Sequence, residues 1–157
     1  MGNLREKVRT ILKENMWLVL GTADEQNQPH SSVVVYQSDG EHLYIQTGSK
    51  TLKAKNIKQN KRVSITIPFR KNFLHKIIPA PPAELHFTAR AKIISKDNEK
   101  AKKILGKYVE SAEIIESNDD TIWIKITPDN IISTYGVGVY LWNMRNPEKA
   151  RNIVKLE

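Results

Sequence analysis

Apolar residues near the N-terminus recur every three or four positions, with charged residues between them, which predicts an amphipathic helix. This apolar stripe consists of Leu4, Val8, Ile11 and Leu12. A second amphipathic helix is expected from Asp97, a suitable N-cap residue, and a short basic helix over residues 51–60. The polar tail from Asn143 onward predicts one more short helix, so three or four helices are expected.

Runs rich in β-branched and aromatic residues predict the strands. The segments are residues 17–23, 31–37, 42–47, 62–69, 85–95, 121–127 and 130–139. Within 31–37, four consecutive apolar residues, Val33 to Tyr36, predict a strand that is covered on both faces. Short turns such as Ser38-Asp39-Gly40 favour antiparallel pairing. We therefore predict a mainly β (α+β) fold, a six- to seven-stranded antiparallel barrel flanked by helices.

The segment from 70 to 83 contains Pro79, Pro81 and Pro82, which exclude regular structure over most of its length. We expect an extended loop that forms a lid or a dimer contact. Gly136 and Gly138 are expected to allow bends in the last strand. Trp17 and Trp123 are expected to pack in the interior.

The composition mainly excludes certain classes of site and of protein. The 157 residues suffice for one domain, and cysteine is absent, which excludes disulfides, thiol nucleophiles and thiolate metal sites. The N-terminus is too polar for a secretory signal, and no apolar run approaches the roughly 20 residues of a membrane span. A reducing cytoplasm is therefore the expected compartment. The four histidines lack metal-binding spacing, so no metal site is predicted.

The net charge of +8 is concentrated in one part of the chain. Between Glu41 and Glu84 there is no acidic residue, and this span holds nine basic ones: Lys50, Lys53, Lys55, Lys58, Lys61, Arg62, Arg70, Lys71 and Lys76. A strand that leads through a Thr/Ser/Gly/Lys turn into a basic helix start favours an anion site. A cofactor phosphate is the expected ligand, and nucleic acid is the alternative.

An ordered set of short motifs within residues 20–67 resembles a known family. Leu20-Gly21-Thr22 is followed by Asp24, a turn ending in Pro29, the valine strand and Asp39-Gly40. The strand LYIQT, Thr51-x-Lys53-x-x-Asn56, Asn60 and Val63-Ser64 complete the set. These residues resemble the flavin-binding split barrel of pyridoxamine 5′-phosphate oxidase-like proteins. Outside this stretch the chain resembles the family in element order.

The resemblance implies that residues 1–157 form a single flavin-binding split-barrel domain. It also implies a homodimer that holds FMN at the subunit interface. The residues that would lie along the flavin ring are Ser31, Ser32, Val33, Val34 and Val35. Gln46 and Thr47 would lie beside the ribityl chain and phosphate, which Thr51 and Lys53 would bind with added charge from Lys50. Trp142 and Arg145 would reach the flavin across the dimer.

The chain also departs from the best-known oxidases, which have arginines where this sequence has Ser31 and Leu52 and a C-terminal arginine motif that is missing here. A true pyridoxamine phosphate oxidase is therefore not expected. We predict an FMN-binding oxidoreductase that transfers hydride or electrons to an unknown small substrate. The alternatives are an F420-dependent reductase of the same fold, a haem-binding relative with His86 as ligand, and a basic nucleic-acid-binding module. No catalytic acid or base is assigned from the sequence.

Overall fold

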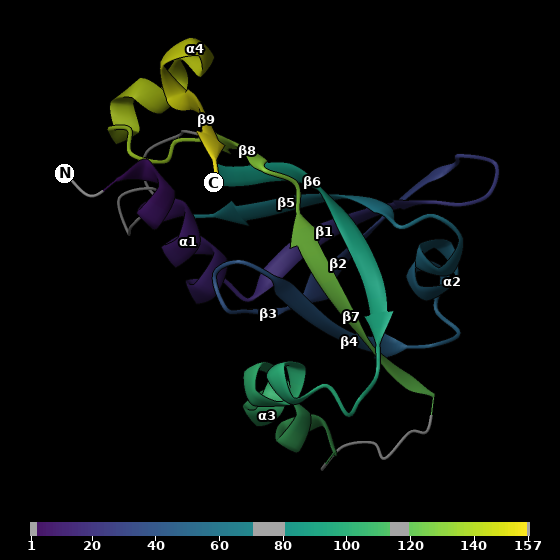
Figure 1. Ribbon diagram of the computed structural model, residues 1–157. Helices are drawn as coiled ribbons and strands as arrows, with labels where there is room; N and C mark the ends of the chain where they lie inside the picture. Colours follow the sequence, from purple (N-terminus) through teal and green to yellow (C-terminus); the bar gives the residue numbers. More distant parts are fainter. Residues whose placement is uncertain (1–2, 71–80, 114–119, 157) are drawn as a thin grey trace.

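The computed structural model describes residues 3–70, 81–113 and 120–156, and the predicted loop at 70–83 therefore lies largely outside the described residues. Its centre is a sheet in which every pairing is antiparallel, in the order β2-β1-β5-β6-β7-β4-β3 (Figure 1). The strands on this path are β1 (Trp17–Ala23), β2 (Pro29–Val35), β3 (Gln37–Ser38), β4 (Leu43–Gly48), β5 (Arg62–Phe69), β6 (Ala83–Ile94) and β7 (Thr121–Pro128). β8 (Ile131–Tyr135) pairs with β6 and with β9 (Arg151–Lys155), so the described sheet has nine strands.

The two ends of the sheet path are consecutive in the chain, because only Tyr36 separates β2 from β3. The sheet must therefore curl until its first and last strands meet, which produces a split barrel rather than a flat sheet. The predicted barrel is confirmed. The strand number rises because β3 is a short continuation of the valine strand and because β9 forms from the tail.

Helices cover the ends and one side of the barrel (Figure 1). They are α1 (Leu4–Glu14), α2 (Leu52–Gln59), α3 (Glu99–Glu113), the 3-10 helix η2 (Leu141–Arg145) and α4 (Pro147–Ala150). Val8 and Leu12 of α1 are fully buried against the barrel core, as the stripe predicts. α3 packs through Ala101 and Leu105 on a second, smaller cluster with Tyr44 and Trp123. None of the described helices has the length and apolar character that crossing a bilayer requires.

Four local predictions need correction or refinement. The N-cap of α3 is Asn98 rather than Asp97, because the Asn98 side chain accepts the Ala101 N–H at 3.0 Å, whereas Asp97 bonds back to Ser95. Trp17 is 57% exposed, although Trp123 is buried as predicted.

The other two concern strands. β2 is covered on one face only, since Ser32 and Val34 face inward opposite Leu20 and Leu18 while Val33 is 69% exposed. The tail contains helices, but residues 151–155 alternate and pair with β8 as a strand. Gly136 and Gly138 take φ values of 75° and 72° just after β8, which confirms the predicted bends.

Candidate functional site

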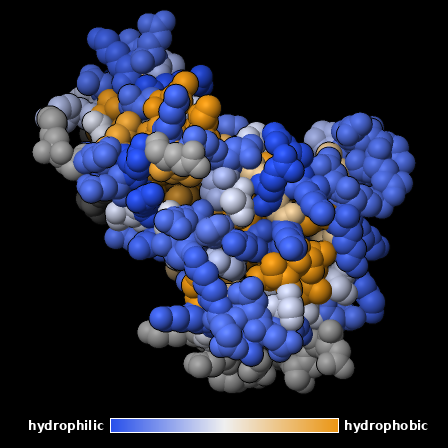
Figure 2. All heavy atoms as spheres, viewed as in Figure 1, coloured by the Kyte–Doolittle hydropathy of each residue, from blue (hydrophilic) through white to orange (hydrophobic). Residues whose placement is uncertain are grey.

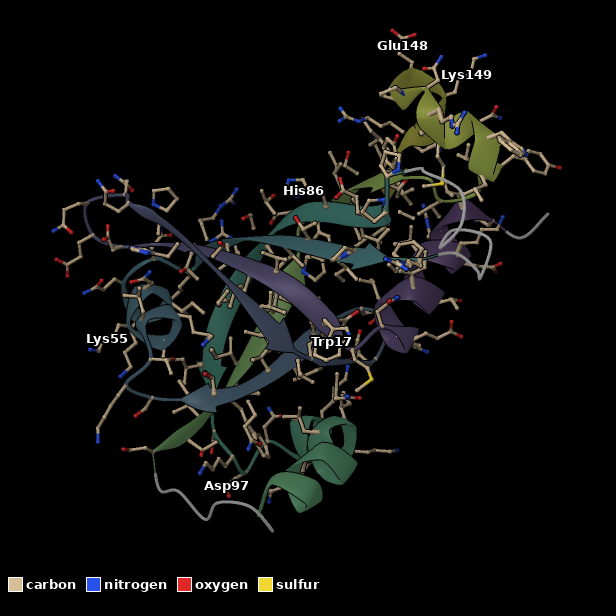
Figure 3. The ribbon with its side chains drawn as sticks, turned by 180° about the vertical axis from the view of Figure 1, so that it is seen from behind. Trp17, Lys55, His86, Asp97, Glu148 and Lys149 are labelled. Carbon is tan, nitrogen blue, oxygen red and sulfur yellow. The ribbon has the colours of Figure 1, made fainter. Side chains whose placement is uncertain are left out.

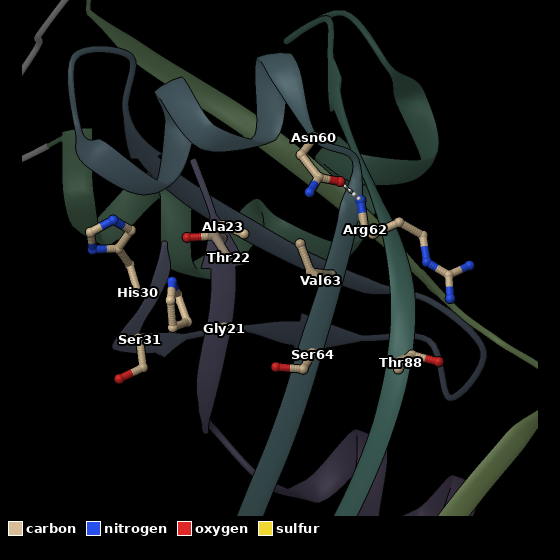
Figure 4. Close-up of a pocket in the computed structure, with 11 residues that line it drawn as sticks. Gly21, Thr22, Ala23, His30, Ser31, Asn60, Arg62, Val63, Ser64 and Thr88 are labelled. Carbon is tan, nitrogen blue, oxygen red and sulfur yellow. Dashed lines mark hydrogen bonds between the residues drawn. The ribbon is translucent and has the colours of Figure 1, made fainter. Parts of the chain in front are cut away.

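The outer face of four neighbouring strands, β2, β1, β5 and β6, forms the candidate site. Alternate residues of these strands point away from the core, because their neighbours Leu20, Ile65 and Phe87 are buried inside the barrel. A hollow of about 640 Å³ opens on this face (Figure 4). Its lining residues are Gly21, Thr22, Ala23, Pro29, His30, Ser31, Asn60, Arg62, Val63, Ser64 and Thr88.

A row of small residues crosses the floor of the hollow. The register pairs Ser31 with Gly21, Gly21 with Ser64, and Ser64 with Thr88, so three hydroxyl side chains and one glycine lie side by side on four strands. We call these four residues the hydroxyl row. A Cβ atom on Gly21 would lie 2.2 Å from Ser64 Oγ, so glycine is what allows the serine hydroxyl to lie across β1. The row offers hydrogen bonds without steric bulk.

A second row runs parallel to the hydroxyl row, two residues further along each strand. Val33 pairs with Val19, Val19 with Thr66, and Thr66 with His86, and we call these the valine–histidine row. Thr66 Oγ1 and His86 Nδ1 are hydrogen-bonded at 3.0 Å. The face therefore changes from hydroxyl groups to an apolar surface that ends in a histidine.

Charged side chains stand at both sides of the hollow (Figure 4). On one side, Arg62 lies 3.6 Å from Asp129, whose carboxylate also accepts a hydrogen bond from Thr88 at 2.5 Å. On the other, His30 Nε2 lies 3.4 Å from Asp24. The backbone N–H of Gln28, assisted by His30 and a further backbone N–H, lowers the pKa of Asp24 despite its partial desolvation. Asp24 thus holds both the β1–β2 turn and the His30 ring.

The basic helix α2 lies at the end of the barrel above the hollow (Figure 4). Thr51 is its N-cap, as predicted: its hydroxyl donates to Gly48 O at 2.8 Å and accepts the Ala54 N–H at 3.4 Å. Asn56 fastens the helix to β1 by donating to Thr22 Oγ1 at 3.1 Å. Among the described residues no acidic side chain pairs with the helix lysines Lys53, Lys55 and Lys58. This end of the molecule therefore carries uncompensated positive charge.

The structure brings some of the predicted site residues to this face and engages others elsewhere. Ser31, Val33 and Val35 point outward, whereas Ser32 and Val34 point into the barrel. Lys50 forms an ion pair with Asp120 at 2.6 Å, and this hydrogen bond raises the pKa of Lys50. Gln46 accepts the Trp123 indole N–H at 3.2 Å and Thr47 pairs with Ile122. Half-buried Lys53 and exposed Arg145 are the predicted cations without an acidic partner in the described part of the chain.

Trp142 and Arg145 lie together on η2, where the Arg145 guanidinium carbon is 5.8 Å from the centre of the Trp142 ring. Figure 1 shows η2 and α4 at the opposite end of the molecule from α2. Within one chain these two residues do not reach the hollow.

Sequence reasoning missed Arg62, Ser64, Thr88 and His30 as lining residues. For Arg62, Ser64 and Thr88 the available signal was the alternation of residues 62–67 and 85–92, in which polar side chains occupy every second position. That pattern identifies an outward-facing set, but it does not reveal which strands lie on either side.

Comparison with known proteins agrees with this architecture. The family model of pyridoxamine 5′-phosphate oxidase matches residues 4–135. The chain belongs to this family. A search of curated proteins finds no match.

Several solved structures share the fold of this family member. One is HutZ, a heme storage protein from Vibrio cholerae, with 22% identity, a TM-score of 0.68, and coverage of 87% of this chain and 97% of that one. A FAD-binding protein from Mesorhizobium loti has 14% identity, a TM-score of 0.65 and coverages of 82% and 91%. A heme binding protein from Mycobacterium smegmatis has 16% identity and a TM-score of 0.71, with coverages of 99% and 59%. The pyridoxamine 5′-phosphate oxidase fold therefore accompanies different cofactors.

Proposed function

We propose that this member of the pyridoxamine 5′-phosphate oxidase family binds FMN and is an oxidoreductase for a small substrate. The observation that carries the proposal is the order of surfaces on one sheet face. A basic helix, the hydroxyl row and the exposed Val33 of the valine–histidine row follow one another along neighbouring strands. FMN has the same order of parts: a phosphate, a polyhydroxyl chain and a flat apolar ring.

The residues present fit such a ligand. Lys53 provides a cation for the phosphate, with Thr51 at the helix N-terminus beside it. Ser31, Ser64 and Thr88 provide hydroxyls for the ribityl chain. Val33 offers an exposed apolar surface to a ring. When bound, FMN would supply the hydride or electron acceptor, and the protein would bind it, orient it and exclude water.

We further propose that two copies associate through this face. Val33 is 69% exposed, Trp17 57% and Met16 52%, and all three lie on or beside the outer side of β1 and β2. Exposed apolar groups gathered in this way favour a protein interface. A partner would cover the open side of the hollow and bring Trp142 and Arg145 of one chain toward the cofactor of the other. The absence of cysteine favours the cytoplasm as the working compartment.

The test is the absorbance spectrum of the purified protein after incubation with FMN and desalting. Wild-type protein should retain the flavin bands, and Lys53→Ala should weaken FMN binding at least tenfold because one charge–phosphate contact is lost. Lys103→Ala, which removes an exposed lysine of helix α3 that does not line the hollow, is the matched control and should bind like wild type. Failure to retain FMN would overturn the assignment, and the same assay with F420 would then decide between the two flavins.

Haem binding is a second candidate because of the geometry of His86. Its Nδ1 is held by Thr66 Oγ1 at 3.0 Å, which leaves Nε2 as the free ligating nitrogen on an exposed, partly apolar face. A Soret band after incubation with haemin that His86→Ala abolishes would support this candidate. A band unchanged in His86→Ala would remove it.

The nucleic-acid alternative gains no support from the described surface. The large exposed apolar side chains include no aromatic residue on α2, whose lysines would contact the backbone. Single-strand binding proteins rely on aromatic side chains between such charges. A steep salt dependence of oligonucleotide binding would be needed to restore this alternative.

A further inference from the structure

A smaller hollow of about 150 Å³ lies on the same outer face, further along β6 and next to β8 and β9. Its lining residues are Glu84, His86, Ser133, Thr134, Tyr135 and Arg151. The register orders five of them across the sheet: Glu84 pairs with Tyr135, Tyr135 with Arg151, and His86 with Ser133. Figure 3 shows His86 on β6, on the part of the sheet that also carries the C-terminal helices.

A carboxylate and a guanidinium share this hollow without meeting. Glu84 and Arg151 lie on strands separated by β8, so their Cα atoms are about 10 Å apart, two strand spacings. No ion pair joins them, and within the described part of the chain neither has another charged partner. Tyr135, which lies between them, donates its hydroxyl to Met144 O and so has no proton left to donate to Glu84.

Neutral polar groups complete the lining. Ser133 contributes a hydroxyl, and His86 is fixed by Thr66 through Nδ1, so its Nε2 remains available. Thr134 is buried and donates to Asn152 O at 3.4 Å, which is a structural role. The hollow thus has an acceptor end, a donor end and hydrogen-bonding groups between them.

This arrangement disfavours ions of a single sign. A simple anion attracted by Arg151 would be repelled by Glu84, and a simple cation attracted by Glu84 would be repelled by Arg151. A molecule that carries both an ammonium and a carboxylate satisfies both side chains at once. The volume equals the liquid share of roughly five water molecules, so the ligand must be small.

We propose that this hollow binds the zwitterionic head of a small amino acid, with its carboxylate on Arg151 and its ammonium group on Glu84. The site does not depend on a flavin. His86 precedes Thr88 of the larger hollow by two residues on the same strand, a separation of about 7 Å. If FMN binds as proposed above, this amino acid is the class of molecule that lies next to it.

The test is an NMR titration of the full-length protein without added flavin, using glycine as the probe. Acetate and methylamine, titrated separately at the same ionic strength, each carry one of its two charges. Glycine should shift the side-chain resonances of Arg151 and His86, and it should bind at least tenfold more tightly than either single-charge probe.

Glu84→Gln and Arg151→Gln should each weaken glycine binding at least tenfold. Lys155→Gln is the matched control, because Lys155 is an exposed cation on the same strand as Arg151 that does not line this hollow. Thermal melts of all variants check that the fold is intact. The proposal would be overturned if glycine bound no more tightly than acetate, or if Lys155→Gln weakened glycine binding as much as Glu84→Gln and Arg151→Gln do. Because no flavin is present, that failure would be distinct from a failure to bind FMN.

Discussion

Asp39 lies in the turn between β3 and β4 and joins that turn to helix α3. Its Oδ1 accepts the N–H groups of Glu41 at 2.9 Å and His42 at 2.6 Å, and its Oδ2 lies 2.7 Å from Lys100 Nζ. Burial alone would raise the pKa of Asp39. The ammonium group of Lys100 and the two backbone N–H groups outweigh that effect and hold the pKa well below its usual value of 3.8.

We predict that Asp39→Asn lowers the free energy of unfolding by about 2 kcal/mol at neutral pH, because charge-assisted hydrogen bonds are lost. Since the folded-state pKa lies below the unfolded value, the stabilisation is complete above about pH 4 and is lost as the pH falls. The difference between variant and wild type should therefore shrink from pH 4 towards pH 2. Urea unfolding across this range measures it, with exposed Asp97→Asn as control. A difference that does not change with pH would contradict the assignment.

At the scale of the element, α2 is held on the barrel by one buried polar contact. Asn56 donates to Thr22 Oγ1 at 3.1 Å, and the two residues are only 2% and 6% exposed. The helix has eight residues, too few to be stable alone, so its position depends on this docking. The position of its lysines at this end of the barrel depends on it too.

Asn56→Leu should lower the free energy of unfolding by about 1–3 kcal/mol, because the Thr22 hydroxyl is left buried without its partner. It should also weaken FMN binding if α2 holds the phosphate. Adding Thr22→Val should recover part of the stability, since both polar groups are then removed. Chemical denaturation of the two single variants and the double variant measures this coupling. Additive losses would show that the contact does not anchor the helix.

At the scale of the whole molecule, the distribution of apolar surface is uneven. Figure 2 shows a largely hydrophilic face on which hydrophobic residues gather in a few places, some of them beside the C-terminal helices. Val33, Trp17 and Met16 add exposed apolar surface on or beside the outer side of β1 and β2. A second copy that covers this surface would also complete the proposed cofactor site.

Val33→Glu should therefore convert a dimer into a monomer, because it places an unpaired charge at the centre of the interface. Light scattering after size-exclusion chromatography measures the mass. Ile131→Glu is the control, since Ile131 is 53% exposed on β8, which is separated from β2 by the three strands β1, β5 and β6. Monomeric wild-type protein, or an equal effect of both variants, would contradict this interface.

Local side-chain patterns predict most of the helices and strands and their order along the chain. Residues 17–23 form β1 as predicted, and the basic helix begins after the Thr51 cap, because strand and helix patterns are local properties of side-chain spacing and capping. The short turns likewise determined the antiparallel pairing and thus the barrel. Motif order within residues 20–67 indicated the family.

Which residues share a surface depends on how the strands pair in three dimensions. The hydroxyl row combines Ser31, Gly21, Ser64 and Thr88 from four strands. If one of these strands were shifted by one residue against its neighbours, its member of the row would be replaced by a residue that points into the barrel. Lys50 meets Asp120 across seventy positions, so its charge is already engaged. Glu84 and Arg151 share a hollow because their strands, β6 and β9, both pair with β8. Such long-range pairing depends on the packing of the whole barrel, which no local pattern encodes.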